Sequence, residues 1–154
     1  MRRFDLRSLR FGDDSEAWRR LPVEVAPFLF GGLEYSVAGG SLDADLTVAR
    51  VGDRLTLALA FDTRVLGPCQ RCLEEAGVAI GGRGLEYVRH GDSEGDEDDE
   101  GYVASYEVDL LRWVRDLVAE ALPPKLLCGD ECRGLCPACG VNLNVQPDHR
   151  HEEA

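Results

Sequence analysis

Two stretches of alternating apolar and polar residues lie on either side of a turn signal in the first half of the chain. Apolar side chains occupy every second position over residues 42–48 and again over residues 55–61, and Gly52 and Asp53 lie between the two stretches. A period of two is typical of a strand with one buried face, and a Gly-containing connection of this kind favours a tight turn. The pattern therefore predicts a β-hairpin, whose second strand ends at Gly67 and Pro68.

Weaker patterns flank this hairpin. Ser15 is expected to cap a short helix that reaches Trp18 and stops at Pro22, after which residues 23–30 (VEVAPFLF) enter a strand. Beyond the hairpin, residues 78–80 and 85–88 are predicted to form two further short strands. Gly81 and Gly82 separate these two strands in this interpretation.

One amphipathic helix is expected over residues 109–122. Its apolar positions recur at helical spacing and form one stripe: Leu110, Leu111, Val114, Leu117, Val118, Ala121 and Leu122. Asp109 is placed to cap the first turn, and Pro123 and Pro124 end the helix. The predicted fold class is α+β, an antiparallel β-rich body with this helix laid over the apolar face of its sheet.

Composition and charge narrow the class of protein. The chain has 154 residues, which suits one domain with a small appended module, and it contains no apolar run of the roughly 18 residues that a membrane span needs. The N-terminus lacks the apolar core of a secretory signal, so a cytoplasmic location is expected. The sequence contains no phosphate-binding loop, nucleophile elbow or HExxH motif, so neither an enzyme nor a small-molecule substrate is expected.

The formal net charge is −12, from 17 basic and 29 acidic residues. This balance argues against broad electrostatic adhesion to nucleic acid and favours a basic partner protein. The charge is uneven, because six arginines lie in the first twenty residues, whereas residues 92–100 are almost all acidic. A local basic face is therefore compatible with the sequence, and residues 91–101 are expected to form an acidic loop.

All six cysteines fall in two places, at Cys69 and Cys72 and then within residues 128–139. Closely spaced thiols in the cytosol bind metal more often than they form disulfides, and a C-x2-C turn directs two thiolates at one ion. The C-terminal motif CPACG resembles a zinc knuckle, in which Gly140 is free to adopt a left-handed conformation. We expect structural Zn²⁺, because a site closed by four protein ligands leaves no open position for a substrate.

The number of ligands suggests how many ions bind. With His149 and His151 the chain offers eight candidate ligands, enough for two sites. The preferred partition places Cys69, Cys72, Cys128 and Cys132 in one site and Cys136, Cys139, His149 and His151 in the other. A rival partition gathers Cys128, Cys132, Cys136 and Cys139 around a single ion. By composition the chain is expected to consist of a β-rich body of residues 1–127 and a cysteine- and histidine-rich module of residues 128–154.

Two arginines lie inside the cysteine motifs. Arg71, within the first C-x2-C, and Arg133, just before the knuckle, are candidates for contact with RNA or with a partner protein. An exposed arginine in such a turn is more often simply solvated. A thiol–disulfide or metal-responsive role for Cys69 and Cys72 is an alternative to structural metal, but it would require a βαβ setting that the pattern does not show.

Several of these motifs together resemble the YceD family, also called DUF177. The resemblance is carried by GPCQRCLE (67–74), the acidic middle, the helix and its exit from DLL to VAEALPPKLLC (109–128) and ECRGLCPACGVNLN (131–144). Family members often end in a C-x-C or H-x-H pair, and the His149–His151 pair is similar to the second form, which supports assigning both histidines to the second site.

The resemblance implies a role in biogenesis of the large ribosomal subunit, where the family affects accumulation or processing of 23S ribosomal RNA without established catalytic activity. The implied partner is a large-subunit rRNA precursor. An acidic adaptor that binds a basic ribosomal or assembly protein without touching RNA remains an alternative. The sequence does not define an oligomeric state.

Overall fold

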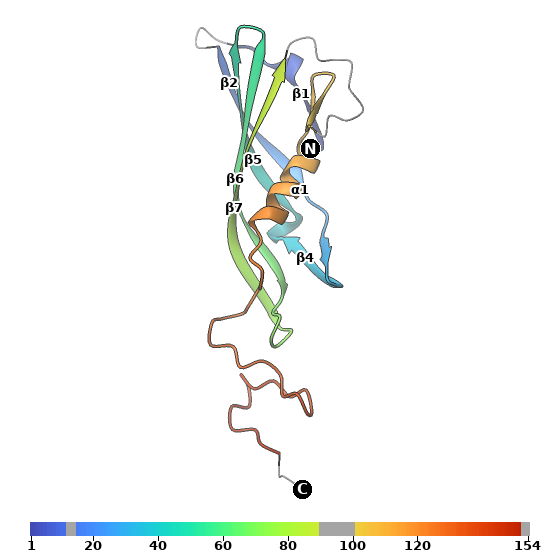
Figure 1. Cartoon of the computed structure of the whole chain (residues 1–154), viewed down its shortest axis with the longest axis vertical. Helices are drawn as coiled ribbons and strands as arrows, with labels where there is room; N and C mark the ends of the chain where they lie inside the picture. Colours follow the sequence, from blue (N-terminus) through green and yellow to red (C-terminus); the bar gives the residue numbers. More distant parts are fainter. Residues whose placement is uncertain (12–14, 90–100, 152–154) are drawn as a thin grey trace.

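A long, twisted antiparallel sheet forms the body of the protein in the computed structural model, which describes residues 1–11, 15–89 and 101–151 (Figure 1). The sheet order is β2-β5-β6-β4-β3, with β7 paired to the other side of β6. The elements of the sheet and its one short 3-10 turn are β2 (Glu16–Glu24), β3 (Phe28–Phe30), β4 (Leu33–Val37), η2 (Ala38–Gly40), β5 (Ser41–Val51), β6 (Arg54–Pro68) and β7 (Glu75–Arg89).

The predicted hairpin is confirmed as β5 and β6. The register pairs Val51 with Arg54 across the turn, and the alternate apolar side chains of both strands are buried. The prediction of two short strands after it was wrong, because β7 is one continuous strand that pairs with β6 along fifteen positions. The glycines do not break β7. A Cβ on Gly82 would collide with the ring of Phe61, and one on Gly84 would lie 2.6 Å from Nε1 of Trp113, so the glycines make room for core rings.

The helix expected after Ser15 was also wrong, because residues 16–24 form the edge strand β2. Ala17, Leu21 and Val23 are buried on one face of β2, but the exposed Arg19 occupies an inward position and Trp18 an outward one, which hides the period of two. Pro22 is compatible with an edge strand, where a missing N–H can face away from the neighbouring strand. The expected strand over residues 23–30 is divided between the end of β2 and β3.

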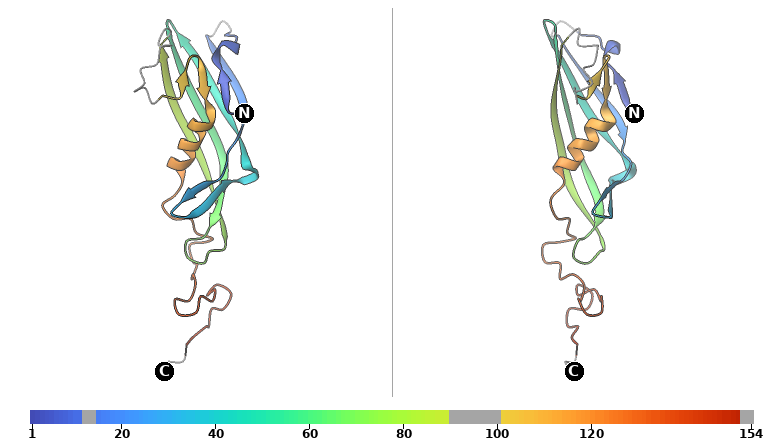
Figure 2. Two further views of the ribbon diagram at one scale, coloured as in Figure 1. Left: turned by 90° about the vertical axis from the view of Figure 1, so that its right-hand side faces the viewer. Right: turned by 45° about the vertical axis from the view of Figure 1, so that its right-hand side comes forward.

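A second layer covers one face of the long sheet (Figure 2). It consists of α1 (Leu110–Ala121) and a small sheet of order β1-β9-β8, formed by β1 (Arg3–Asp5), β8 (Val103–Ala104) and β9 (Glu107–Asp109), with η1 (Leu6–Ser8) following β1. The predicted helix is confirmed, and Oδ1 of Asp109 accepts a hydrogen bond from the Arg112 N–H at 3.1 Å. Leu110, Trp113 and Val114 face the sheet and are buried. The α+β fold class is therefore confirmed.

The chain after α1 runs past the turn between β6 and β7 and extends the molecule along its long axis (Figures 1 and 2). Within residues 122–151 the structure has turns and a single isolated bridge between Leu135 and Asn142. The one α-helix of the described residues has 12 residues, and none of these residues forms a helix suited to crossing a membrane. Of the expected acidic loop 91–101, all but Gly101 lie outside the described residues.

Candidate metal centres

The first cluster brings together four cysteines from two distant parts of the chain: Cys69, Cys72, Cys128 and Cys132. Cys69 and Cys72 lie in the turn that joins β6 to β7, and the other two follow the exit of α1. Sγ of Cys69 lies 3.8 Å from Sγ of Cys132, and Sγ of Cys72 lies 3.6 Å from Sγ of Cys128. All four sulfurs lie within 4.8 Å of one another.

Backbone hydrogen bonds shape the C-x2-C turn. The Cys69 N–H donates to the Glu74 carbonyl at 2.7 Å, and the Leu73 N–H donates to the Cys69 carbonyl at 2.9 Å. Leu73 completes the turn in the left-handed region, with φ of 63°. The Gln70 N–H donates to the Leu126 carbonyl at 2.9 Å, so the turn is tied to the segment that follows α1.

Arg71 fastens the two halves of the first cluster together. Its Nη1 donates to the carbonyls of Asp130 at 3.1 Å and Cys132 at 2.9 Å, while its own carbonyl accepts from the Leu135 N–H at 3.2 Å. Gly134 is required at this contact, because it has φ of 76° and a Cβ there would lie 3.0 Å from the Arg71 carbonyl oxygen. The contacts of Arg71 within the described residues therefore hold the cluster in place, although the side chain remains exposed.

The pKa values of the cysteines in the first cluster favour a bound cation. Burial disfavours ionisation of Cys69, but N–H groups of Arg71, Cys72 and Cys128 outweigh it and lower the pKa of Cys69 to about 6. Hydrogen bonds with Cys132 and Cys72 raise the pKa of Cys128 to about 12. Four sulfurs this close do not all ionise without compensation, because like charges disfavour one another, and a metal ion supplies the missing positive charge.

The second cluster is local and more exposed. It consists of Cys136, Cys139, His149 and His151. Sγ of Cys136 lies 3.1 Å from Nε2 of His151, Sγ of Cys139 lies 3.2 Å from Nε2 of His149, and the two Nε2 atoms lie 3.1 Å apart. The Cys136 sulfur faces N–H groups of Ala138 and Cys139, which together with His151 lower its pKa to about 6.

A knuckle turn presents the two cysteines of the second cluster. The Gly140 N–H donates to the Cys136 carbonyl at 2.8 Å, and the Cys136 N–H donates to the Val141 carbonyl at 2.8 Å. Gly140 has φ of 75°, the left-handed conformation that the sequence CPACG predicts.

Asn144 connects the two clusters and is a residue that the sequence reasoning missed. Its Nδ2 donates to Sγ of Cys132 at 3.3 Å, which lowers the pKa of that thiol, and its Oδ1 accepts from the Arg133 N–H at 2.8 Å. Nη1 of Arg133 in turn donates to the Pro147 carbonyl at 3.0 Å, in the loop that leads to the histidines. The only signal was a pair of asparagines, Asn142 and Asn144, just after the knuckle, and asparagine commonly bonds nearby backbone in turns.

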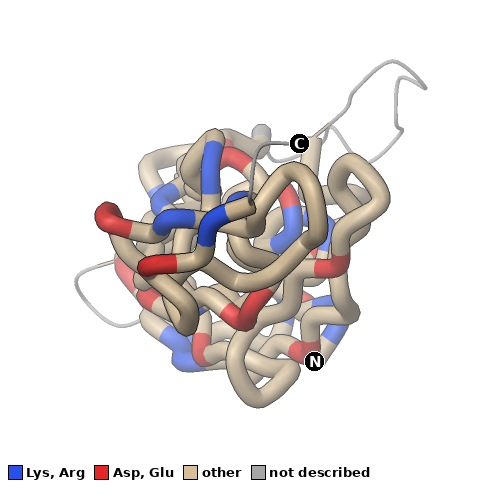
Figure 3. Tube along the Cα trace, turned by 90° about the horizontal axis from the view of Figure 1, so that it is seen from below, with Lys and Arg blue, Asp and Glu red and all other residues tan. Residues whose placement is uncertain are grey.

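The structure thus groups the eight candidate ligands into the same two sets of four as the preferred partition. The rival set divides between the clusters, because Cys128 and Cys132 belong to the first and Cys136 and Cys139 to the second. Arg71 and Arg133 both lie at the end of the molecule that carries the clusters. Seen along the long axis from that end, basic and acidic residues are interspersed (Figure 3).

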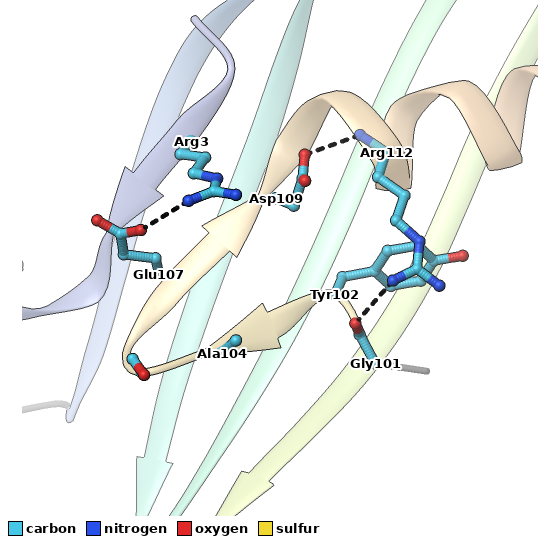
Figure 4. Close-up of a pocket in the computed structure, with 8 residues that line it drawn as sticks. Arg3, Gly101, Tyr102, Ala104, Glu107, Asp109 and Arg112 are labelled. Carbon is cyan, nitrogen blue, oxygen red and sulfur yellow. Dashed lines mark hydrogen bonds and ion pairs between the residues drawn. The ribbon is translucent and has the colours of Figure 1, made fainter. Parts of the chain in front are cut away.

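A separate hollow of about 270 Å³ lies at the start of α1 (Figure 4). Its charged groups already bond within the protein. Arg3 pairs with Glu107 at 3.4 Å, the Asp109 carboxylate accepts from the backbone of Arg112, and Nη1 of Arg112 donates to the Gly101 carbonyl at 3.3 Å. These contacts tie β9 and the start of α1 to their neighbours.

Comparison with known proteins places these motifs in a family. The sequence model of the family described as large ribosomal RNA subunit accumulation protein YceD matches residues 57–154, which include both clusters. An uncharacterised protein of Mycobacterium tuberculosis is 34% identical over 119 residues, covering 75% of this chain and 58% of the relative. An uncharacterised protein of Mycobacterium leprae is 30% identical over 127 residues, covering 79% of this chain and 58% of the relative.

A maize protein is also similar over a shorter stretch. It is called large ribosomal RNA subunit accumulation protein YCED homolog 1, chloroplastic, and is 35% identical over 67 residues, which are 42% of this chain and 23% of the relative. The chain therefore spans little more than half the length of its mycobacterial relatives. No solved structure matches the chain at a significant level.

Proposed function

The chain belongs to the YceD family of large ribosomal RNA subunit accumulation proteins, and from this premise we propose that it is a non-enzymatic factor that supports accumulation or processing of 23S ribosomal RNA during assembly of the large subunit. The family match over residues 57–154 carries the proposal. The name of the maize relative supports the same kind of function.

Each cluster is proposed to hold one structural Zn²⁺ ion. A tetrahedral ion with Zn–S bonds of about 2.3 Å separates its sulfur ligands by about 3.8 Å, and the two sulfur pairs of the first cluster lie 3.8 Å and 3.6 Å apart. Sulfur and imidazole nitrogen are donors that Zn²⁺ prefers over Mg²⁺ or Ca²⁺, which take oxygen. Four protein ligands close each site, so the metal would order the loops and leave no position for a substrate.

Arg71 and Arg133 are proposed to contact the rRNA precursor or a protein bound to it. Both residues are exposed at the cluster end, and Nη1 donates to two backbone carbonyls in Arg71 and to one in Arg133. A guanidinium offers five N–H donors in a fixed plane, so such anchoring restrains the group and leaves further donors for a partner. Replacing both arginines with lysine should keep the charge but weaken the anchoring and the association with precursor.

The redox alternative has one observation in its favour, the low pKa of Cys69. The same N–H groups that lower that pKa also suit a thiolate that ligates metal, and Cys69 is fully buried among three other cysteines. The two roles separate on reactivity. A metal ligand resists alkylation in the metal-loaded protein, whereas a redox thiol reacts rapidly.

The function is tested by purifying the full chain from cells after crosslinking, sequencing the bound RNA and measuring zinc in the same preparation. We expect precursor of the large-subunit rRNA, lost after nuclease treatment, and two zinc ions per chain. Depletion of the protein should lower the level of mature 23S rRNA. Capture of a basic ribosomal protein that survives nuclease would instead support the acidic-adaptor alternative, and normal rRNA after depletion would refute the proposed function.

A further inference from the structure

No described element covers one broad face of the long sheet. The helix and the small sheet lie against the opposite face, as two views of the ribbon agree (Figures 1 and 2). On the uncovered face, here called the outer face, large apolar side chains point into solvent: Trp18 is 52% exposed, Leu85 62% and Tyr87 71%. Apolar side chains gathered on one face of a soluble protein commonly mark an interaction site.

The strand register places these side chains in two adjacent rows. One row runs from Trp18 on β2 through Thr47 and Ala58 to Leu85 on β7. In the neighbouring row Thr56 pairs with Tyr87. The side chains between the two aromatic rings are small and half-buried, so the rings stand at opposite edges of a floor of small side chains. With strands about 4.8 Å apart, the rings lie three strand spacings, about 14 Å, apart across the sheet.

Two arginines lie beside this floor, although the chain as a whole is acidic and the exposed Glu16 borders the row that ends at Tyr87. Arg20 is held by Asp45 at 2.8 and 3.0 Å, with its guanidinium carbon 5.6 Å from the centre of the Trp18 ring. Arg54 is exposed beside Thr56, and within the described residues its side chain forms no hydrogen bond or ion pair. A guanidinium that has no partner among the described residues and lies beside exposed rings suits single-stranded nucleic acid, because phosphates pair with arginine and bases stack on aromatic rings.

A second copy of the chain fits this face less well. The two rows across four strands cover roughly 250 Å², whereas a stable protein interface takes about 800 Å² from each partner. Further along the face, the apolar rows give way to charged side chains that are already paired, such as Arg83 with Asp62 at 3.0 Å. Because these charges are already paired within one chain, they leave few charged groups to form ion pairs with a second copy.

We propose that the outer face of β2, β5, β6 and β7 is a platform for unpaired RNA bases, which stack on Trp18 and Tyr87 while Arg54 contacts phosphate. The choice of RNA rests on the proposed function. The platform lies on the sheet body, away from the cysteine clusters, so it is a contact region separate from Arg71 and Arg133 (Figure 1).

The test measures binding of the full, zinc-loaded chain to a fluorescently labelled, unstructured 12-nucleotide RNA, with the matching duplex as a second probe. Trp18→Ala with Tyr87→Ala should weaken binding to the single strand by at least about 25-fold, since each stacked base contributes about 1–3 kcal/mol. Trp18→Phe with Tyr87→Phe should retain most of the affinity. Leu29→Ala, at a site on β3 that is 73% exposed, is the matched control and should change nothing.

Two further readouts separate stacking from general adhesion. The oligonucleotide should quench the fluorescence of Trp18, and Trp18→Phe should remove that signal because Trp113 is buried. Arg54→Ala should lower the slope of log affinity against log salt by about 0.7, as expected for one lost phosphate contact. Unchanged circular dichroism and thermal midpoint would show that each variant is folded.

The platform is refuted if the wild-type chain binds the duplex as tightly as the single strand, or if the double alanine variant binds the single strand normally. Loss of a nuclease-resistant protein contact in that variant would assign the face to a protein, and loss of a concentration-dependent dimer in sedimentation would assign it to a second copy. Both results overturn the RNA platform. If the platform fails while depletion still lowers 23S rRNA, the proposed function stands, and if rRNA is normal after depletion, that function fails on its own.

Discussion

Breaking the first cluster should destabilise the sheet body, whereas breaking the second should not. We consider Cys128→Ser with Cys132→Ser, and as the matched control Cys136→Ser with Cys139→Ser, both in the zinc-loaded chain. Each pair removes two sulfurs, one of them buried in each case, and each should cost one zinc ion of two. The clusters differ in what they connect.

The expected magnitude follows from the length of chain that each cluster closes. Cys72 and Cys128 are 56 residues apart, and those residues include β7 and α1. A covalent crosslink of that span removes about 4 kcal/mol of chain entropy from the unfolded state, and a tight metal site acts similarly. Cys139 and His149 are 10 residues apart, outside the sheet. Closing that loop contributes roughly 3 kcal/mol, but this free energy stabilises only the loop itself and not the sheet body.

The assay is urea unfolding followed by the fluorescence of Trp113, which is 2% exposed and stacks on Tyr102 with ring centroids 5.2 Å apart. A Trp18→Phe background removes the exposed tryptophan. We expect the first pair of substitutions to lower the free energy of unfolding by about 4 kcal/mol, and the control pair to change it by less than about 0.5 kcal/mol. Equal losses in the two variants, or no loss in the first, would refute the reasoning.

Three further outcomes are expected. Gly82→Ala should lose about 1–3 kcal/mol of stability because its Cβ meets the buried Phe61 ring. Gly81→Ala should lose less in the same urea titration, because its Cβ meets the exposed Asp62 carboxylate, which can shift together with its partner Arg83; equal effects would contradict the packing argument. Asp109→Ala should lose about 1 kcal/mol with the cap of α1, and Asp109→Asn should keep most of it; a similar loss for both would show that the cap bond does not matter. A chromogenic chelator should remove zinc in two phases, with the second cluster first because half of its ligands are exposed; a single phase would contradict the difference in burial.

The elements that the sequence predicts well are those with a strong local period. The β5–β6 hairpin and α1 each bury most of one face, so their apolar spacing survives in the sequence. β2 was missed because it lies at the sheet edge, where Arg19 is exposed at a position that alternation would assign to the core. β7 was divided at glycines whose purpose depends on Phe61 and Trp113, which lie far away in the sequence.

For the clusters, too, the sequence predicts the ligands but not the contacts that hold them. Eight ligands are enough for two sets of four, and the preferred partition joins Cys69 and Cys72 to the first two cysteines after the helix, with the local set of four as its rival. The link from Asn144 to Cys132 and the anchoring of Arg71 on backbone carbonyls depend on how the loops cross. Neither follows from a pattern along the chain.

The span of the first cluster also has a consequence for synthesis of the protein. A ribosome makes Cys69 and Cys72 well before it makes Cys128 and Cys132, so an emerging chain carries a lone pair of thiols with no partners. By the time the missing pair appears, every described strand and α1 have already been made. Zinc could therefore bind the complete first site only after the whole sheet body has been synthesised. A chain that stalls earlier would expose the reactive thiols of Cys69 and Cys72 to oxidants and to the quality-control machinery of the cell.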